Sequence, residues 1–139
     1  MFRTILLPVD LTDKHARAME LATELAGQGG GEVILLHVIE VIAGLSLEEE
    51  REFYKRLELK ARKHLDRLGN QLKNQQRTWR TEVLFGNRAA EIVRFAAGAA
   101  VDLIIVTSPR LDPNRLGAGL ASLSYKISLW CQCPVLLVK

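Results

Sequence analysis

The chain alternates short apolar runs with longer stretches in which apolar residues recur every three or four positions. Unbroken apolar runs of this kind are typical of strands that are covered on both faces, as in a parallel sheet. One further run is more amphipathic and is expected at a sheet edge. The expected strands are residues 2–10, 32–38, 78–85, 102–107 and 134–138, of which 78–85 is the amphipathic one.

The segment after the first apolar run has the signals of a helix. Either Thr12 or Asp13 can cap its first turn, because both side chains can accept hydrogen bonds from free backbone amides. The glycines at 29–31 should follow its end, where glycine is the usual residue. They are not interpreted as a phosphate-binding loop, since such a loop precedes a helix.

Three more helices are expected. Ser46 and Glu49 have the spacing of a capping box at the start of a long second helix. Asn87 should cap a third helix, and a fourth should span residues 119–130. The second helix has a buried stripe at helical spacing, formed by Tyr54, Leu57, Ala61, Leu65, Leu68 and Leu72.

Strands and helices therefore alternate along the whole chain. Crossovers between parallel strands are right-handed, so this order builds a sheet with helices on both faces. We expect one α/β domain over residues 1–139, folded as a three-layer α/β/α sandwich. The first strand stops at Pro8 and ends on Asp10. Ligands bind at the carboxyl edge of such sheets, which makes Asp10 the first candidate site residue.

The composition is that of a soluble globular protein, with 48% hydrophobic and 25% charged residues. The net charge is +3, and basic and acidic residues interleave over 48–67, which favours a solvated helix face over a nucleic-acid surface. No stretch has the pattern of a signal peptide or the length of a membrane span. Cys131 and Cys133 suggest no disulfide framework, and we expect a cytoplasmic protein that binds neither nucleic acid nor a membrane.

No set of residues indicates catalysis or metal binding. His15, His37 and His64 fall in different elements, which argues against a metal site. His37 is expected to make a buried hydrogen bond, and His64 to lie on the charged side of its helix. The two cysteines lack the Cys-x-x-Cys redox spacing, and Cys133 is expected in the core. Asp10 has no acidic or metal-holding partners nearby in the sequence, so we expect no catalytic residue.

Five segments resemble the motifs of one family in order and spacing over the full length of the chain. They are Ile5-Leu6-Leu7-Pro8-Val9-Asp10, Leu36-His37-Val38, Gly86-Asn87-Arg88-Ala89-Ala90-Glu91-Ile92, residues 100–106 and residues 133–138. In these segments the chain resembles the universal stress protein family. The resemblance implies a Rossmann-like, adenine nucleotide alpha hydrolase-like fold with a five-stranded parallel sheet in the order 3-2-1-4-5. It also implies a homodimer formed through the last strand.

Many members of the family bind ATP through glycines after the fourth strand and a Gly-Ser or Gly-Thr pair before the last helix. The corresponding positions here hold Ser108, Leu111, Ala121 and Ser122, so only the serine matches. The resemblance implies that any nucleotide site would be formed by Pro8, Val9, Asp10, Val38, Thr107, Ser108, Arg110, Ala121, Ser122 and Leu123.

Three functions are compatible with these features. The first is a cytoplasmic stress-response protein with a degenerate nucleotide site, which has no turnover and acts through protein partners or through a ligand other than ATP. The second is an ATP-binding protein, with slow ATP hydrolysis as an option. The third is a signalling module that senses another small metabolite, which only the fold supports. Leu111 and Asp112 discriminate between the first two, because side chains turned into the cavity would close the phosphate site.

Overall fold

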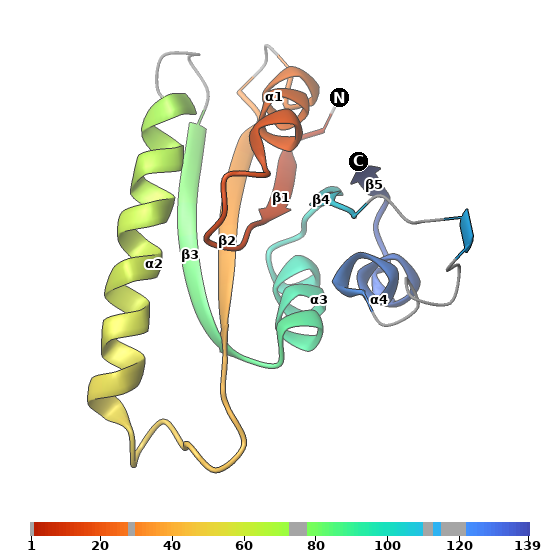
Figure 1. The fold of residues 1–139 in the computed structure, drawn as a ribbon. Coiled ribbons are helices and arrows are strands. Elements are labelled where there is room, and N and C mark those ends of the chain that lie inside the picture. Colours follow the sequence, from red (N-terminus) through yellow and green to blue (C-terminus); the bar gives the residue numbers. More distant parts are fainter. Residues whose placement is uncertain (1, 28–29, 73–77, 110–112, 115–121) are drawn as a thin grey trace.

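A computed structural model describes residues 2–27, 30–72, 78–109, 113–114 and 122–139. Helices and strands alternate along these parts of the chain, as the hydrophobic pattern predicts (Figure 1). In chain order they are β1 (Thr4–Pro8), α1 (Ala16–Leu25), β2 (Glu32–Glu40), α2 (Arg51–Leu72), β3 (Thr78–Gly86), α3 (Arg88–Gly98), β4 (Leu103–Thr107), α4 (Leu123–Trp130) and β5 (Val135–Val138).

The strands form one parallel sheet in the order β3-β2-β1-β4-β5, which confirms the predicted fold class and strand order. β2 and β3 pair from Glu32 to Glu40, so β2 runs two residues beyond the predicted 32–38. The extension is apolar as far as Ile39, and β3 supplies partners along its whole length.

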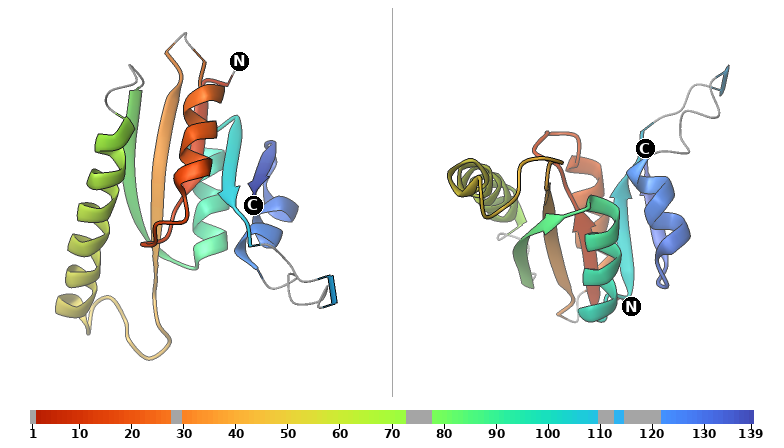
Figure 2. Two further views of the ribbon diagram at one scale, coloured as in Figure 1. Left: turned by 45° about the horizontal axis from the view of Figure 1, so that its top comes forward. Right: turned by 90° about the horizontal axis from the view of Figure 1, so that it is seen from below.

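The helices cover the two faces of the sheet, because alternate residues of each central strand point in opposite directions. Ile5 and Leu7 of β1 pack with α1 and α2, whereas Leu6 packs with α3 and α4. α1 and α3 accordingly lie on opposite sides of the sheet (Figure 2). All three β1 side chains are fully buried, as expected for a strand covered on both faces.

The first helix differs from the prediction at both ends. It begins at Ala16 with His15 as its cap residue, so neither Thr12 nor Asp13 caps it. The backbone N–H of Thr12 instead donates to the side chain of Asp10, which holds these residues in a turn. The helix ends at Leu25, and the glycine that directly follows its end is Gly27, with a left-handed backbone (φ 75°), instead of the glycines at 29–31.

The starts of two other helices also differ from the prediction. α2 begins at Arg51 after a turn, although the Ser46 hydroxyl does accept the backbone N–H of Glu49 at 3.1 Å. The described part of α4 begins at Leu123 instead of residue 119. For α3 the prediction is confirmed, since the Asn87 side chain accepts the N–H of Ala90 at 3.0 Å.

Candidate functional site

β1 keeps its pairing with β2 but loses its pairing with β4 toward the carboxyl edge of the sheet. It pairs with β2 over its whole length and with β4 only through Ile5 and Leu6. Pro8 has no N–H to donate, and the N–H of Val9 donates to the Leu36 carbonyl of β2 at 2.9 Å. The end of β1 therefore stays with β2, and a crevice opens between the carboxyl ends of β1 and β4.

Asp10 lies at this crevice with its carboxylate held on both oxygens. Oδ1 accepts the backbone N–H of Thr12 at 3.0 Å and lies 2.8 Å from His15 Nε2, and Oδ2 is 2.9 Å from Lys14 Nζ. Partial burial on its own would raise the pKa of Asp10. The hydrogen bonds from Thr12, Lys14 and His15 outweigh it and hold the pKa well below the usual range. Asp10 is therefore an anion at neutral pH.

His15 connects the end of β1 to the end of β4. Its Nδ1 lies 2.9 Å from the hydroxyl of Thr107, the last residue of β4. Burial lowers the pKa of His15, so its ring is neutral and carries one proton at neutral pH. The backbone N–H of Asp10 also points to Nε2 at 3.2 Å, but the carboxylate is closer and charged, so we assign the proton to Nε2 and Nδ1 then accepts from the Thr107 hydroxyl. This chain of three side chains spans the crevice.

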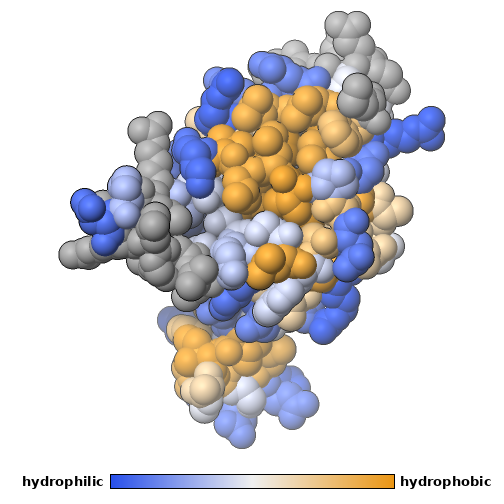
Figure 3. Space-filling view, turned by 90° about the vertical axis from the view of Figure 1, so that its right-hand side faces the viewer, coloured by the Kyte–Doolittle hydropathy of each residue, from blue (hydrophilic) through white to orange (hydrophobic). Residues whose placement is uncertain are grey.

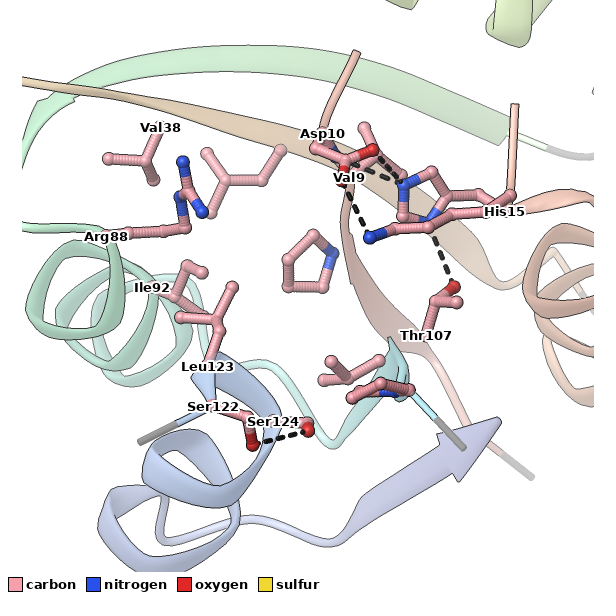
Figure 4. A pocket seen from close by; sticks show the side chains of 15 residues that line it. Val9, Asp10, His15, Val38, Arg88, Ile92, Thr107, Ser122, Leu123 and Ser124 are labelled. Atoms are coloured by element: carbon pink, nitrogen blue, oxygen red, sulfur yellow. Dashed lines mark hydrogen bonds and ion pairs between the residues drawn. The ribbon is translucent and has the colours of Figure 1, made fainter. Parts of the chain in front are cut away.

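A cavity of about 240 Å³ occupies the crevice (Figure 4). Its apolar wall comes from four elements: Val9 follows β1, Val38 lies on β2, Ile92 on α3 and Leu123 at the start of α4. Asp10, His15 and Thr107 form the polar side of the same space. The cavity therefore combines an apolar wall with a carboxylate that is held in place.

Two cationic side chains also line the cavity. Lys14 is bound to Asp10, as described, and Arg88 is the first residue of α3. The guanidinium of Arg88 lies beside Val38 (Figure 4), and its Nε is 3.9 Å from a carboxylate oxygen of Glu40. That ion pair is long and largely exposed, so it holds Arg88 weakly.

Serine hydroxyls form the side of the cavity next to α4. Ser122 caps this helix, since its Oγ accepts the N–H of Tyr125 at 3.2 Å. Ser124 Oγ lies 3.2 Å from both Ser122 Oγ and Ser108 Oγ. Ser108 itself is buried and receives a further hydrogen bond from Lys139 Nζ. The hydroxyl of Ser108 thus points to other serines and does not line the cavity.

Comparison with known proteins places the chain in a family. A model of the universal stress protein family matches residues 1–139. The chain belongs to the universal stress protein family. Universal stress protein MJ0531 of Methanocaldococcus jannaschii is 28% identical over 144 aligned residues, which cover all of this chain and 83% of that protein.

Solved structures show the same fold. The structure of the hypothetical protein MJ0577 is 27% identical, with a TM-score of 0.83, and the match covers 100% of this chain and 96% of that one. A universal stress protein from Archaeoglobus fulgidus, solved in complex with dAMP, is 18% identical, with a TM-score of 0.72 and 99% and 98% coverage. The family and the fold that the motifs imply are therefore confirmed.

Most site residues that the family motifs imply lie together. The cavity is lined by Pro8, Val9, Asp10, Val38, Thr107, Ser122 and Leu123. Ser108 lies behind it, and Arg110 and Ala121 fall outside the described residues, as do the discriminating Leu111 and Asp112.

Four polar lining residues were missed by the sequence reasoning, namely Lys14, His15, Arg88 and Ser124. Lys14 and His15 stand four and five positions after Asp10, a spacing that a single turn brings back to the carboxylate. Arg88 follows the cap residue of α3 and occupies the position where the family pattern has proline or alanine. Each could have been found by asking which residues lie just before or at the start of a helix at the carboxyl edge of the sheet.

The other two histidines are structural. His37 is buried and its Nδ1 lies 2.8 Å from the Val9 carbonyl, which confirms the predicted hydrogen bond. The prediction for His64 is wrong: it is 9% exposed and lies on the buried side of α2, with Nδ1 accepting from Arg67 at 2.8 Å. Among the described residues, no three His, Cys, Asp or Glu side chains could hold a metal ion. Within the same residues, no helix is long and apolar enough to cross a membrane.

Proposed function

We propose that this universal stress protein binds an adenine nucleotide in the cavity between β1 and β4 and acts as a cytoplasmic regulatory binding protein without turnover. The observation that carries the proposal is the pairing of an apolar wall with a fixed anionic acceptor. Val38 and Ile92 offer the apolar surface that a base needs, and Asp10 offers oxygens to a ribose hydroxyl. The two free cysteines fit a reducing cytoplasm.

The phosphate end of the ligand would lie near the start of α4. Helix N-termini attract anions, and Ser122 and Leu123 bring this one to the cavity. Proteins of the same fold support a nucleotide of this size, since one of them holds dAMP, another AMP and a third cAMP. Only Ser122 keeps the family's phosphate signature, so we expect the monophosphate to account for most of the affinity.

The absence of turnover follows from the state of Asp10. A general base works best when its pKa is near the operating pH. The pKa of Asp10 is held far below that, so its carboxylate can accept hydrogen bonds but takes up a proton poorly. Both ring nitrogens of His15 already have hydrogen-bond partners, Nε2 with Asp10 and Nδ1 with Thr107. Neither side chain is free to take a proton from an attacking water.

Isothermal titration calorimetry with nucleotide-free protein tests the proposal, with adenosine, AMP and Mg-ATP as probes. We expect AMP to bind, and Asp10→Asn to weaken binding by about tenfold or more, since a hydrogen bond to a charged group contributes about 1.5–3 kcal/mol. The matched control is Asp13→Asn, which removes the same charge from the same loop. The Asp13 side chain is 93% exposed and does not line the cavity, so its loss should change affinity less than twofold or so.

Two results would count against the proposal. Absence of heat and of any thermal shift with millimolar AMP and ATP would refute nucleotide binding. Phosphate release from Mg-ATP that disappears in Asp10→Asn would refute the binding-only part and leave nucleotide binding standing. Equal losses in Asp10→Asn and Asp13→Asn would mean that charge alone, and not the carboxylate in the cavity, sets the affinity.

We also propose a homodimer formed through β5. This strand lies at one edge of the sheet, where its outer backbone groups have no partner strand in the described sheet. Apolar side chains gather on the face that carries α4 and β5 (Figure 3). Leu129, Trp130 and Leu137 are 61%, 51% and 38% exposed there, and a second copy of the chain would cover them.

Light scattering after size exclusion tests the dimer. We expect a dimer for the wild type at micromolar concentration and a monomer for Leu137→Lys. The matched control is Leu59→Lys, because Leu59 is also an exposed leucine (54%) but lies on α2, away from β5. A monomeric wild type, or a dimer that Leu137→Lys leaves intact, would refute this interface.

A further inference from the structure

Arg88 brings a cationic side chain to the part of the cavity that would hold the base of a nucleotide. It begins α3 one turn before Ile92, and residues four apart lie on the same face of a helix. Both residues line the cavity, and the guanidinium lies beside Val38, on the side of the cavity opposite Thr107 (Figure 4). Arg88 therefore continues the apolar wall that Val38 and Ile92 form.

The protein itself makes little use of the guanidinium. Its ion pair with Glu40 joins only Nε to a carboxylate oxygen, and at 3.9 Å this contact is longer than a hydrogen bond. The guanidinium donates no hydrogen bond to another residue that the structure describes. A guanidinium offers several N–H donors and no acceptor. These donors are therefore available to a ligand in the cavity.

The proposed function indicates which end of a nucleotide would meet these donors. The ribose would lie at Asp10 and the phosphate near the start of α4, so the base would extend toward Val38 and Arg88. A purine is attached to ribose through N9, and its six-membered ring lies farthest from that bond. The far edge of the base, which carries the group at position 6, is then the part of the ligand nearest to Arg88.

Position 6 distinguishes the two classes of purine. Adenine carries an amino group there, which would set donors against the donors of a guanidinium. Guanine and hypoxanthine carry a carbonyl oxygen, and this O6 and the neighbouring N7 are two adjacent acceptors that an arginine can bind together. The same fork-like geometry makes such contacts strong and specific.

We propose that Arg88 reads position 6 of the bound purine, so that the site takes 6-oxopurine nucleotides at least as tightly as adenine nucleotides. This inference rests on the proposed nucleotide site and concerns only which purine that site takes. Arg88 acts here as a specificity-determining residue, since it touches the base and takes no part in any reaction.

Isothermal titration calorimetry with IMP and AMP tests the inference, because these two nucleotides have the same ribose, the same phosphate and the same N7. We expect IMP to bind to the wild type at least as tightly as AMP does. Arg88→Ala should lower the affinity for IMP by about tenfold or more and that for AMP by less than about threefold. Arg88→Lys should show the same selective loss, because lysine keeps the charge but lacks the planar fork.

Arg94→Ala is the matched control for the two Arg88 variants. Arg94 also lies on α3, but its side chain is largely exposed and does not line the cavity. The substitution removes the same charge from the same helix, and both affinities should stay within about twofold of the wild type. AMP binding that persists in Arg88→Ala shows that this variant is folded.

The possible failures of this inference and of the proposed function can be told apart. If AMP binds to the wild type more tightly than IMP, or if Arg88→Ala leaves the ratio of the two affinities unchanged, Arg88 does not read position 6. Nucleotide binding would then stand and the inference would fall. If neither nucleotide binds at millimolar concentration, the proposed function is wrong and the inference fails with it.

Discussion

The carboxyl end of α3 offers a test of the backbone in which one substitution should have opposite effects at two nearby positions. Ala100 has a left-handed backbone (φ 52°), which alanine rarely adopts. The N–H of Val101 donates to the Ala96 carbonyl at 3.0 Å, and the N–H of Ala100 to the Ala97 carbonyl at 3.4 Å. These two bonds form a Schellman motif, in which the left-handed position is usually glycine.

We expect Ala100→Gly to stabilise the protein. A left-handed residue with a Cβ costs about 1–2 kcal/mol, and glycine loses about 0.4–1 kcal/mol more backbone entropy on folding. The net gain is therefore about 0.5–1 kcal/mol. For 139 residues the entropy of unfolding is about 0.3 kcal/mol per degree, so the melting temperature should rise by about 2–3 °C.

Ala97→Gly is the matched control for this prediction. Ala97 is also exposed, but it lies inside α3, where glycine costs about 0.5–1 kcal/mol relative to alanine. Urea unfolding followed by circular dichroism at one fixed protein concentration measures both variants. Ala100→Gly should raise the urea midpoint and Ala97→Gly should lower it. If Ala100→Gly is neutral or destabilising while Ala97→Gly behaves as expected, residue 100 does not have the left-handed backbone.

Two further predictions concern the packing of α2 and the buried histidines. A Cβ added at Gly69 would clash with the Trp79 ring, so Gly69→Ala should lower the free energy of unfolding in urea by about 1–3 kcal/mol, and a neutral result would mean that Trp79 does not pack there. Burial lowers the pKa of His15 and of His37, so the unfolded state binds protons first as the pH falls. Stability should therefore be constant above their usual pKa of 6.5 and fall below it, and a stability that rises between pH 7 and pH 5.5 or so would contradict this assignment.

The sheet could be predicted from the sequence because its strands are buried on both faces and leave unbroken apolar runs. Strand order came from the family motifs, since apolar runs alone do not say which strand lies beside which. The start of α1 was missed because Thr12 and Asp13 lie in a turn that Asp10 holds through the N–H of Thr12, and the helix begins after His15 without a side-chain cap. Asp10, Thr12 and Asp13 all have side chains that can cap a helix, and their spacing alone does not show where the helix begins.

The candidate site was predictable where a strand end or a family motif marked the residues. Asp10 follows the first strand, and the rule that ligands bind at the carboxyl edge of the sheet found it, whereas Val38 and Thr107 came from the family motifs. Arg88 was missed because its side chain reaches the cavity from the first turn of a helix. His64 was misplaced because a buried histidine among charged neighbours has the same sequence pattern as an exposed one.

The proton on His15 connects the fold of the crevice to its proposed ligand. The neutral ring has one N–H, which we assign to Nε2 because the Asp10 carboxylate lies 2.8 Å away. The Thr107 hydroxyl then donates to Nδ1 and has no proton left for a ligand. A second proton on His15 makes Nδ1 a donor, which turns the Thr107 hydroxyl around and frees its hydrogen for the cavity. Nucleotide affinity should therefore change as His15 titrates below its usual pKa of 6.5. His15→Gln should abolish that change, whereas a pH profile that survives this substitution would show that Thr107 is not coupled to the ligand through His15.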